Sequence, residues 1–449
     1  MNKFITTIIF LTILLTVFSC RKSDYTTISG DYIVITDDGN GIGTTTWSKD
    51  KKYLLDGFVF VNDGQTLIIE PGTVIRAKTG QGSNATALII ARGAKIIAEG
   101  TRENPIIFTV EGDDLEGSVP VMSKGLCGGI IILGNAKLNT DANEAMIEGI
   151  PYTEPRGVYG GNDDEDDSGI LRYVSIRHGG TNIGEGNEIN GLTLGGVGSS
   201  TIIDYVEIIS NKDDGIEFFG GTVNCKHIIV AFCGDDCFDF DNGYRGYGQF
   251  WLAIQDVAEG DLISEHDGGS DPITGTPYSI PVIYNSTFIG RGNDILNNLM
   301  IFKENAAGKY ANSIFINQGK GIEIEYKENR KNSYDQFEDG NLEFRNNIFY
   351  QIGNDSINEI FKVFGDDGVD VSQQNTIFRN YALSANNLIT DPGIEITDNT
   401  YLIIPSNNSL GNLCEYPDPW FVQVDYKGAF GNYNWANGWS LLSQSGFIE

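Results

Sequence analysis

Short apolar or alternating runs of strand length follow one another along almost the whole chain, and amphipathic-helix spacing is nearly absent. Runs of this length, bounded by Gly, Asn and Asp, are typical of β-strands joined by turns. The pattern therefore predicts an all-β fold. The clearest predicted strands are residues 66–70, 73–77, 87–91, 106–110, 129–133, 171–176, 201–209 and 226–231.

The strand pattern repeats. Residues 214–218 (DGIEF) recur as residues 236–240 (DCFDF), 22 positions later, and the strands that precede them keep the same offset. A period near 22 predicts a β-solenoid, in which successive coils stack as parallel strands about 4.8 Å apart. A β-propeller is the main alternative, but its blades need about 40 residues each. Long insertions at 256–281 and 329–341 are expected to shape one side of the solenoid.

Asparagine marks a second repeat. Asn285, Asn312 and Asn346 each open a similar motif (NSTF, NSIF and NNIF). In a solenoid these side chains fall in one column. We therefore expect their amides to hydrogen-bond to one another along the stack, as Asn ladders do in cross-β packing.

The N-terminus has the pattern of an export signal. Lys3 precedes an almost wholly apolar stretch, residues 4–18, whose length suits a secretory signal and is short of the roughly 20 residues that span a bilayer. The stretch ends at Ser19-Cys20, which resembles the lipobox of bacterial lipoproteins. We predict a signal peptide at 1–19, lipid attachment at Cys20 through acyl chains such as palmitate, and a tether over residues 20–50. An ordinary signal peptide with an incidental cysteine is the alternative.

The net charge of the chain limits which partners it can bind. The chain carries 30 Lys and Arg against 61 Asp and Glu, a formal charge of −31. Such a surface repels nucleic acid and anionic headgroups, so we expect no nucleic-acid partner. It favours cations, although acidity is also a simple route to solubility.

Cysteine and histidine are too scattered for a zinc site. We expect buried thiols, with a Cys233–Cys237 disulfide as the alternative and the state of Cys225 open. The residues concerned are Cys127, Cys225, Cys233, Cys237 and Cys414, with His178, His227 and His266.

Residues 415–449 are crowded with aromatic side chains and lack the 22-residue unit. Solenoid ends must be covered because they expose strand edges. We therefore predict a solenoid over 51–414 and an aromatic C-terminal cap over 415–449. A sugar-binding aromatic platform is the alternative for this segment.

The repeat, the turn motifs and the C-terminal YKGAF and NWANGW segments (426–430 and 434–439) resemble a family of uncharacterised Bacteroidetes lipoproteins. That resemblance covers most of the mature chain. It implies a pectin-lyase-like, right-handed parallel β-helix, anchored by lipid in the outer membrane and facing outward. It implies no activity.

A weaker resemblance is to polygalacturonases, inverting glycoside hydrolases with the same fold. Asp214-Gly215 and the Gly-Asp-Asp-Cys at 234–237 match their active-site motifs, one coil apart. The resemblance implies Asp236 as general acid with Asp214 and Asp235 as bases, since inversion needs carboxyls on both sides of the bond. The sequence differs from the polygalacturonase motifs elsewhere. The Asn that precedes Asp-Gly in that family is Lys212 here, and the family's Arg-x-Lys motif is not found, with Arg291 only a loose substitute for it.

Two functions therefore remain. The first is a surface lipoprotein that binds a glycan, a cation or a partner outer-membrane protein without catalysis. Asp213, Asp214, Asp235 and Asp236 are its candidate cation ligands, with calcium the candidate ion. The second is a hydrolase or lyase that acts on uronate-rich polysaccharide through Asp214, Asp235 and Asp236; a lyase would want calcium and a base such as Lys212 or Arg245.

Overall fold

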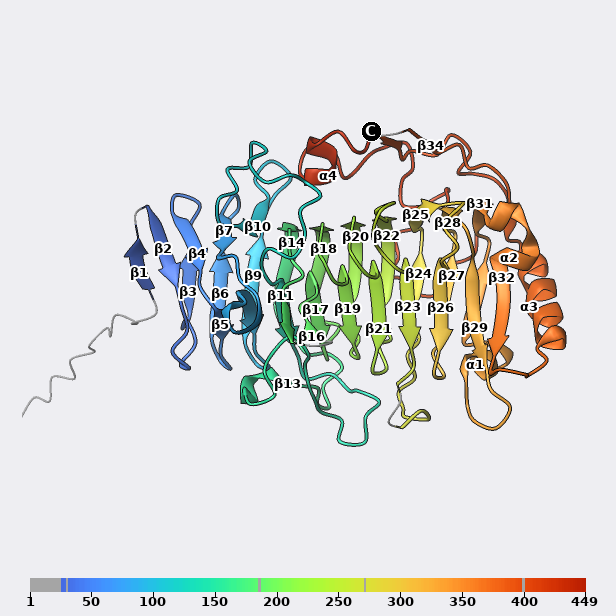
Figure 1. Ribbon diagram of the computed structural model, residues 1–449, viewed down its shortest axis with the longest axis horizontal. Coiled ribbons are helices and arrows are strands. Elements are labelled where there is room, and N and C mark those ends of the chain that lie inside the picture. Colours follow the sequence, from blue (N-terminus) through green and yellow to red (C-terminus); the bar gives the residue numbers. More distant parts are fainter. Residues whose placement is uncertain (1–25, 30, 185–186, 270–271, 398–399) are drawn as a thin grey trace, which may run out of the picture.

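The computed structural model describes residues 26–449 except 30, 185–186, 270–271 and 398–399. Cys20 and the predicted signal peptide lie outside the described residues. The described chain winds into an elongated parallel β-helix, with β1 at one end and α3 at the other (Figure 1). Among the described residues, no helix is long and apolar enough to cross a membrane.

Two stacked sheets form the walls. Within the described residues, sheet B has ten strands, each paired in parallel with the next. Its strands are β5 (Phe58–Val61), β8 (Ala87–Ile90), β11 (Ile130–Leu133), β17 (Leu192–Gly195), β19 (Ile216–Phe219), β21 (Phe238–Asp241), β23 (Ser264–Asp267), β26 (Met300–Lys303), β29 (Ile322–Tyr326) and β32 (Phe361–Gly365).

Sheet A has 19 strands in the described part of the chain, and its pairings there are parallel except that between β1 and β2. They are β1 (Thr26–Ser29), β2 (Tyr32–Ile35), β3 (Thr45–Trp47), β4 (Lys52–Leu55), β6 (Thr66–Ile69), β7 (Val74–Ala77), β9 (Lys95–Glu99), β10 (Ile106–Val110), β14 (Gly169–Arg177), β18 (Ile202–Ile209), β20 (Asn224–Ala231), β22 (Tyr247–Ile254), β24 (Val282–Tyr284), β25 (Thr287–Gly292), β27 (Gly308–Ala311), β28 (Ile314–Gln318), β30 (Leu342–Arg345), β31 (Ile348–Ile352) and β33 (Leu388–Ile389).

The remaining elements lie in turns and at the C-terminal end. Three short hairpins pair β12 (Ala145–Met146) with β13 (Val158–Tyr159), β15 (Asn182–Gly184) with β16 (Asn187–Glu188), and β34 (Glu395–Ile396) with β35 (Tyr401–Leu402). The helices are α1 (Ser333–Glu338), α2 (Ile357–Ile360), α3 (Ser372–Ser384) and α4 (Leu441–Gln444), with 3-10 turns η1 (Gly82–Asn84), η2 (Pro155–Gly157) and η3 (Gly353–Asp355).

The predicted register is confirmed. Ile216 pairs with Phe238 and Val206 pairs with Ile228, both at the 22-residue offset read from the repeat. All eight predicted strands fall on observed strands of sheets A and B. The fold class is therefore an all-β parallel β-helix.

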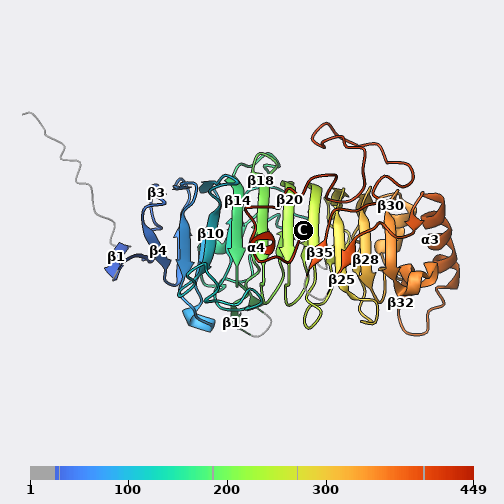
Figure 2. The same cartoon turned by 90° about the horizontal axis from the view of Figure 1, so that it is seen from above.

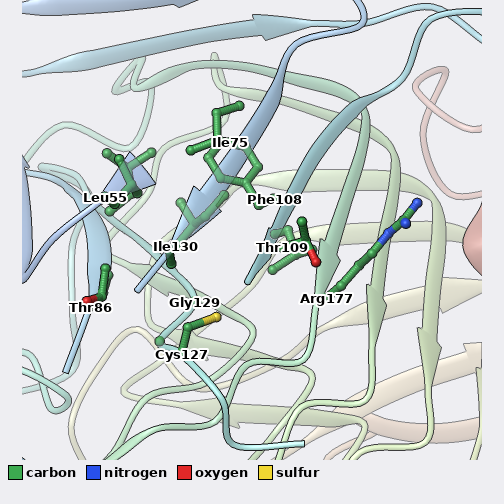
Figure 3. A pocket seen from close by; sticks show the side chains of 14 residues that line it. Leu55, Ile75, Thr86, Phe108, Thr109, Cys127, Gly129, Ile130 and Arg177 are labelled. Atoms are coloured by element: carbon green, nitrogen blue, oxygen red, sulfur yellow. The ribbon is translucent and has the colours of Figure 1, made fainter. Parts of the chain in front are cut away.

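Side chains from both sheets fill the bore. Phe218, Phe240 and Trp251 are fully buried and stack on one another. Near the N-terminal end, a cavity of about 20 Å³ beside Ile75 and Ile130 has room for about one water (Figure 3). The bore is therefore a packed core and not a ligand channel.

The asparagine prediction needs correction. Asn285, Asn312 and Asn346 do share a column, and each has a positive φ of 53–57° at the bend between two strands. Their side-chain amides bond mainly to C-terminal backbone, through the carbonyls of Tyr426, Cys414 and Asn412. One longer bond follows the column, from Asn285 Nδ2 to the Asn312 carbonyl at 3.5 Å. The polar ladder runs one residue later, where Asn347 Oδ1 accepts from the Ser313 N–H and Asn387 Oδ1 from the Asn347 N–H.

The solenoid ends also differ from the sequence-based expectation. The last coil is covered by α3, whose Phe378 packs on Phe361 of β32 at 5.4 Å between ring centroids. Residues 412–449, the C-terminal strap, run back along the flank over the coils from β31 to β14 (Figures 1 and 2). The parallel stack already includes β2 and β3, so part of the predicted tether belongs to the solenoid.

The strap is fixed by specific contacts with distant coils. The Val422 N–H donates to Gln249 Oε1 at 2.8 Å, and the Cys414 N–H donates to Asn312 Oδ1 at 2.7 Å. Trp439 is fully buried against Tyr173 and Tyr205. The aromatic residues of this segment thus bury a flank of the helix, and they do not close its end.

Candidate functional site

The outer face of sheet B carries a column of carboxylates. Along β19, β21 and β23 the side chains alternate, as strand geometry requires. Phe218, Phe240 and His266 point into the core, so Glu217, Asp239 and Glu265 line up outside on three successive coils.

More acidic groups surround this column. Asp241 and Asp267 lie two residues further along β21 and β23, while Glu148 comes from a neighbouring loop and Glu188 from the hairpin strand β16. Lys303, on the next strand, places Nζ 3.0 Å from Glu265 and 3.7 Å from Asp267. This surface, the acidic face, comprises Glu148, Glu188, Asp213, Asp214, Glu217, Asp235, Asp236, Asp239, Asp241, Asp261, Glu265 and Asp267.

The four predicted aspartates sit on the turns that enter β19 and β21, and the structure brings them together. Asp214 and Asp236 are buried, Asp213 is half-buried and Asp235 is exposed. Asp214 Oδ1 accepts a hydrogen bond from the Asp236 N–H at 2.9 Å. Asp236 Oδ1 accepts one from the Leu262 N–H at 2.6 Å, one coil further on. Both buried aspartates therefore join the backbone of adjacent coils.

Three groups of oxygens on the acidic face are close enough to share an ion. In each group the ligand atoms lie within 4.8 Å of one another: Asp213, Asp214 and Asp235; Asp214, Glu217 and Asp239; Asp235, Asp236 and Asp261. Calcium binds oxygen at 2.3–2.6 Å, so ligands on opposite sides of one ion lie about 5 Å apart.

The middle group has unused acceptors. Oδ1 of Asp239 is buried and accepts no hydrogen bond from the residues that the structure describes, and the same is true of Oδ1 of Asn190. Asn190 Nδ2 donates to Glu217 and, at 3.4 Å, to Glu148. A buried acceptor without a partner is costly, and a cation would satisfy it. The donor set, carboxylate and amide oxygen, fits a hard cation such as calcium.

Crowding raises the pKa values of these groups. Burial, followed by repulsion from Glu188 and Glu148, raises the pKa of Asp213 to about 7. Burial also raises the pKa values of Asp214 and Asp239 well above their usual range, with neighbouring carboxylates adding to the effect. The acidic face therefore holds protons near neutral pH unless a cation replaces them.

The basic residues considered from the sequence are engaged elsewhere. Lys212 Nζ lies 3.7 Å from Glu259, and Arg245 pairs with Asp164. Arg291 donates to the backbone carbonyls of Asp256 and Gly260.

Sequence reasoning missed most of the acidic face. Residues 256–281 were read as an insertion, whereas they contain β23 and with it Glu265 and Asp267. The aligned repeat did hold a usable signal, because Glu217 and Asp239 occupy the same outward position 22 residues apart. Glu148 lies on a loop outside the repeat, and nothing in the repeat places it here.

The thiol expectation is confirmed, since all five described cysteines are free and four of them are buried. His266 is a core residue, with Nε2 2.9 Å from the hydroxyls of both Ser264 and Tyr310. The aromatic-platform alternative fails for Trp435 and Trp439, because these strap residues are buried against the coils.

A groove of about 440 Å³ separates the strap from the outer side of sheet A. Tyr247 and Tyr284 line it with Lys309, Glu343 and Arg345. Aromatic rings beside charged groups that can hydrogen-bond give it a mixed character typical of small-ligand sites.

Comparison with known proteins identifies the family. The model of a family described as a pectate-lyase-like beta helix domain matches residues 39–393. Searches of curated proteins and of solved structures found no match. The match spans most of the chain and agrees with the stacked parallel sheets, and the chain therefore belongs to the pectate-lyase-like β-helix family.

Proposed function

We propose that this protein is a non-catalytic binding protein of the outer cell surface, held there by lipid on Cys20, and that its acidic face binds divalent cations, calcium foremost. The observation that carries the proposal is the group formed by Asp214, Glu217 and Asp239. Their oxygens are spaced for a shared ion, and a buried acceptor among them has no partner.

Calcium binding is tested by titrating the purified full-length protein in a calorimeter after treatment with EDTA. The Glu217→Gln/Asp239→Asn double variant removes two charges while keeping side-chain size. The matched control, Asp50→Asn/Glu103→Gln, removes two charges from exposed positions elsewhere. We expect saturable calcium binding that the first variant weakens about tenfold or more, which is about 1.4 kcal/mol, and that the control retains. Equal binding by both variants would refute this site.

A catalytic function is the competing proposal, because carboxylates with raised pKa are typical of general acids. Two contacts weigh against it: Asp214 and Asp236 are each occupied by a backbone N–H of the next coil. Assays for new reducing ends on acidic and neutral glycans, with and without calcium, separate the two functions. Cleavage that is abolished in Asp235→Asn/Asp236→Asn would overturn the non-catalytic proposal.

Glycan binding is a second candidate, favoured by the groove beside Tyr247 and Tyr284. A glycan array probed with the wild-type protein and with a Tyr247→Ala variant tests it. Loss of a signal in the variant, with calcium binding unchanged, would assign the glycan to the groove and not to the acidic face.

The anchor is tested separately in cells. A Cys20→Ala variant should move from the membrane fraction to the soluble fraction and lose incorporation of a labelled fatty acid. Retention of both properties would exclude Cys20 as the lipidated residue.

A further inference from the structure

A second cavity shares no lining residue with the groove or with the acidic face. It measures about 290 Å³ and opens between the loop that carries Glu116 and the strap residues Leu441 and Gln444. Arg177 and His178, at the end of β14, complete its lining. Its volume lies at the lower end of those of ligand-binding cavities, so a ligand there would be small.

Arg177 is the unusual residue of this cavity. The residue is 3% exposed, and its Nη2 is buried with no hydrogen-bond partner in the described part of the chain. Its Nε donates to the hydroxyl of Ser175 at 2.8 Å, a neutral group. Figure 3 shows the guanidinium directed away from the apolar bore at Leu55 and Ile130.

The nearby carboxylates do not use the guanidinium, because other donors occupy them. Glu207 accepts from the Ser175 hydroxyl at 2.6 Å and from the N–H groups of Leu441 and Leu442 at 2.8 and 2.9 Å. Asp113 accepts from the Thr109 hydroxyl and the Leu115 N–H. A buried guanidinium normally ends in a paired carboxylate or phosphate. Arg177 lines the cavity and forms no ion pair within the described residues.

The cavity walls are fixed before any ligand arrives. His178 Nδ1 lies 2.7 Å from the Ser123 carbonyl, and the Ser210 hydroxyl donates to the Val121 carbonyl at 2.6 Å, so the loop is tied to the coils. Burial lowers the pKa of His178, which leaves Arg177 as the cationic side chain among the cavity residues. Preformed walls reduce the entropy lost on binding.

We propose that this cavity binds a small monoanionic carboxylate through the guanidinium of Arg177. A carboxylate matches the planar fork of the guanidinium. The single positive charge, with Asp113 and Glu207 close by, disfavours doubly charged phosphate or sulfate. The site acts independently of calcium.

The test measures binding of acetate and lactate to the purified full-length protein in EDTA, by calorimetry and by thermal shift, with sodium chloride at equal ionic strength. We expect saturable binding and a rise in Tm. Arg177→Gln should weaken binding about tenfold or more, the loss that a charge-assisted pair typically brings. Arg330→Gln, which removes an exposed arginine, should leave binding unchanged.

A second variant keeps the test decisive if Arg177→Gln fails to fold. Glu116 is exposed at the rim, so Glu116→Gln should fold normally and strengthen acetate binding a few-fold by removing a like charge. Absence of saturable acetate binding, tighter binding of phosphate or sulfate, or no change in Glu116→Gln would each overturn the proposal.

Discussion

Two columns of stacked side chains run along this β-helix. One is aromatic and covered by the strap, and the other is acidic and lies on the outer face of sheet B. On the flank under the strap, Tyr173, Tyr205 and His227 stack at 4.4 and 4.1 Å between ring centroids, and Trp435 and Trp439 pack over them. On sheet B, carboxylates occupy successive coils with Lys303 as their basic partner.

The two columns differ in whether the chain itself supplies the groups that satisfy them. In a solenoid, equivalent positions of successive coils lie side by side, so similar residues form continuous columns. An apolar column on the outside must be shielded from water, and a charged column needs ions of opposite charge. The chain provides the cover through its own strap. For the acidic face it provides few cations, and we infer that protons or ions from solution complete it.

The largest change in stability is expected when the aromatic column loses the strap side chain that covers it. Trp439→Ala should destabilise the protein by about 3–5 kcal/mol, because it removes a fully buried indole and leaves a cavity over Tyr173. Chemical denaturation measures this. Tyr433→Ala, an exposed aromatic of the same segment, should cost about 0.5 kcal/mol or less. Equal effects would show that the strap does not fold with the helix.

The carboxylates of the acidic face should make the free energy of unfolding depend on pH. Groups such as Asp213 have a higher pKa in the folded state than the usual value of 3.8, so the folded chain holds protons that the unfolded chain has released. This stability is complete below about pH 4 and is lost as pH rises through the folded pKa, about 7 for Asp213. In EDTA we expect a loss of about 4 kcal/mol between pH 4 and pH 8, because the pKa of Asp213 is raised from 3.8 to about 7 and each pKa unit corresponds to about 1.4 kcal/mol.

Calcium should reduce this loss if it replaces the protons. The free energy of unfolding measured in EDTA and in calcium at several pH values distinguishes the cases. A flat profile in EDTA, or one that rises from pH 4 to pH 8, would show that the carboxylates are not crowded in the way the structure indicates.

A carboxylate on the covered side should behave in the opposite way. Glu207 is fully buried, and it accepts hydrogen bonds from two strap N–H groups, those of Leu441 and Leu442, and from the Ser175 hydroxyl. Glu207→Gln should therefore destabilise by about 1–2 kcal/mol, because charge-assisted hydrogen bonds become neutral and one donor loses its acceptor. Thermal unfolding at pH 7.5 provides the measurement, and a stabilised variant would contradict the strap contacts.

The same substitution on the acidic face should have a smaller effect of reversed sign. Glu217→Gln should have its smallest effect at low pH, because burial and the neighbouring carboxylates raise the pKa of Glu217. At pH 8 in EDTA it should stabilise by about 0.5–1 kcal/mol, since it removes a like charge among Glu148, Asp214 and Asp239. Destabilisation at pH 8 would mean that the hydrogen bond from Asn190 to the ionised Glu217 outweighs the repulsion from its neighbours.

Much of the fold could be predicted from the sequence because a repeat is local information. The offset between residues 214–218 and 236–240 gave the register of β19 and β21 directly. The acidic site was predicted only in part. The repeated Asp-Asp motif predicts Asp213, Asp214, Asp235 and Asp236. It does not predict Glu265, because β23 follows a longer turn and its offset differs from 22 residues.

The sequence by itself determined the parallel stack, its spacing and the excess of negative charge, since each follows from composition and from residues one coil apart. Only the tertiary structure decided where the strap lies, what covers the last coil, and that Glu148 joins the carboxylates. The physical reason is distance along the chain. Glu207 meets Leu441 across 234 residues, and no periodicity carries information over such a separation.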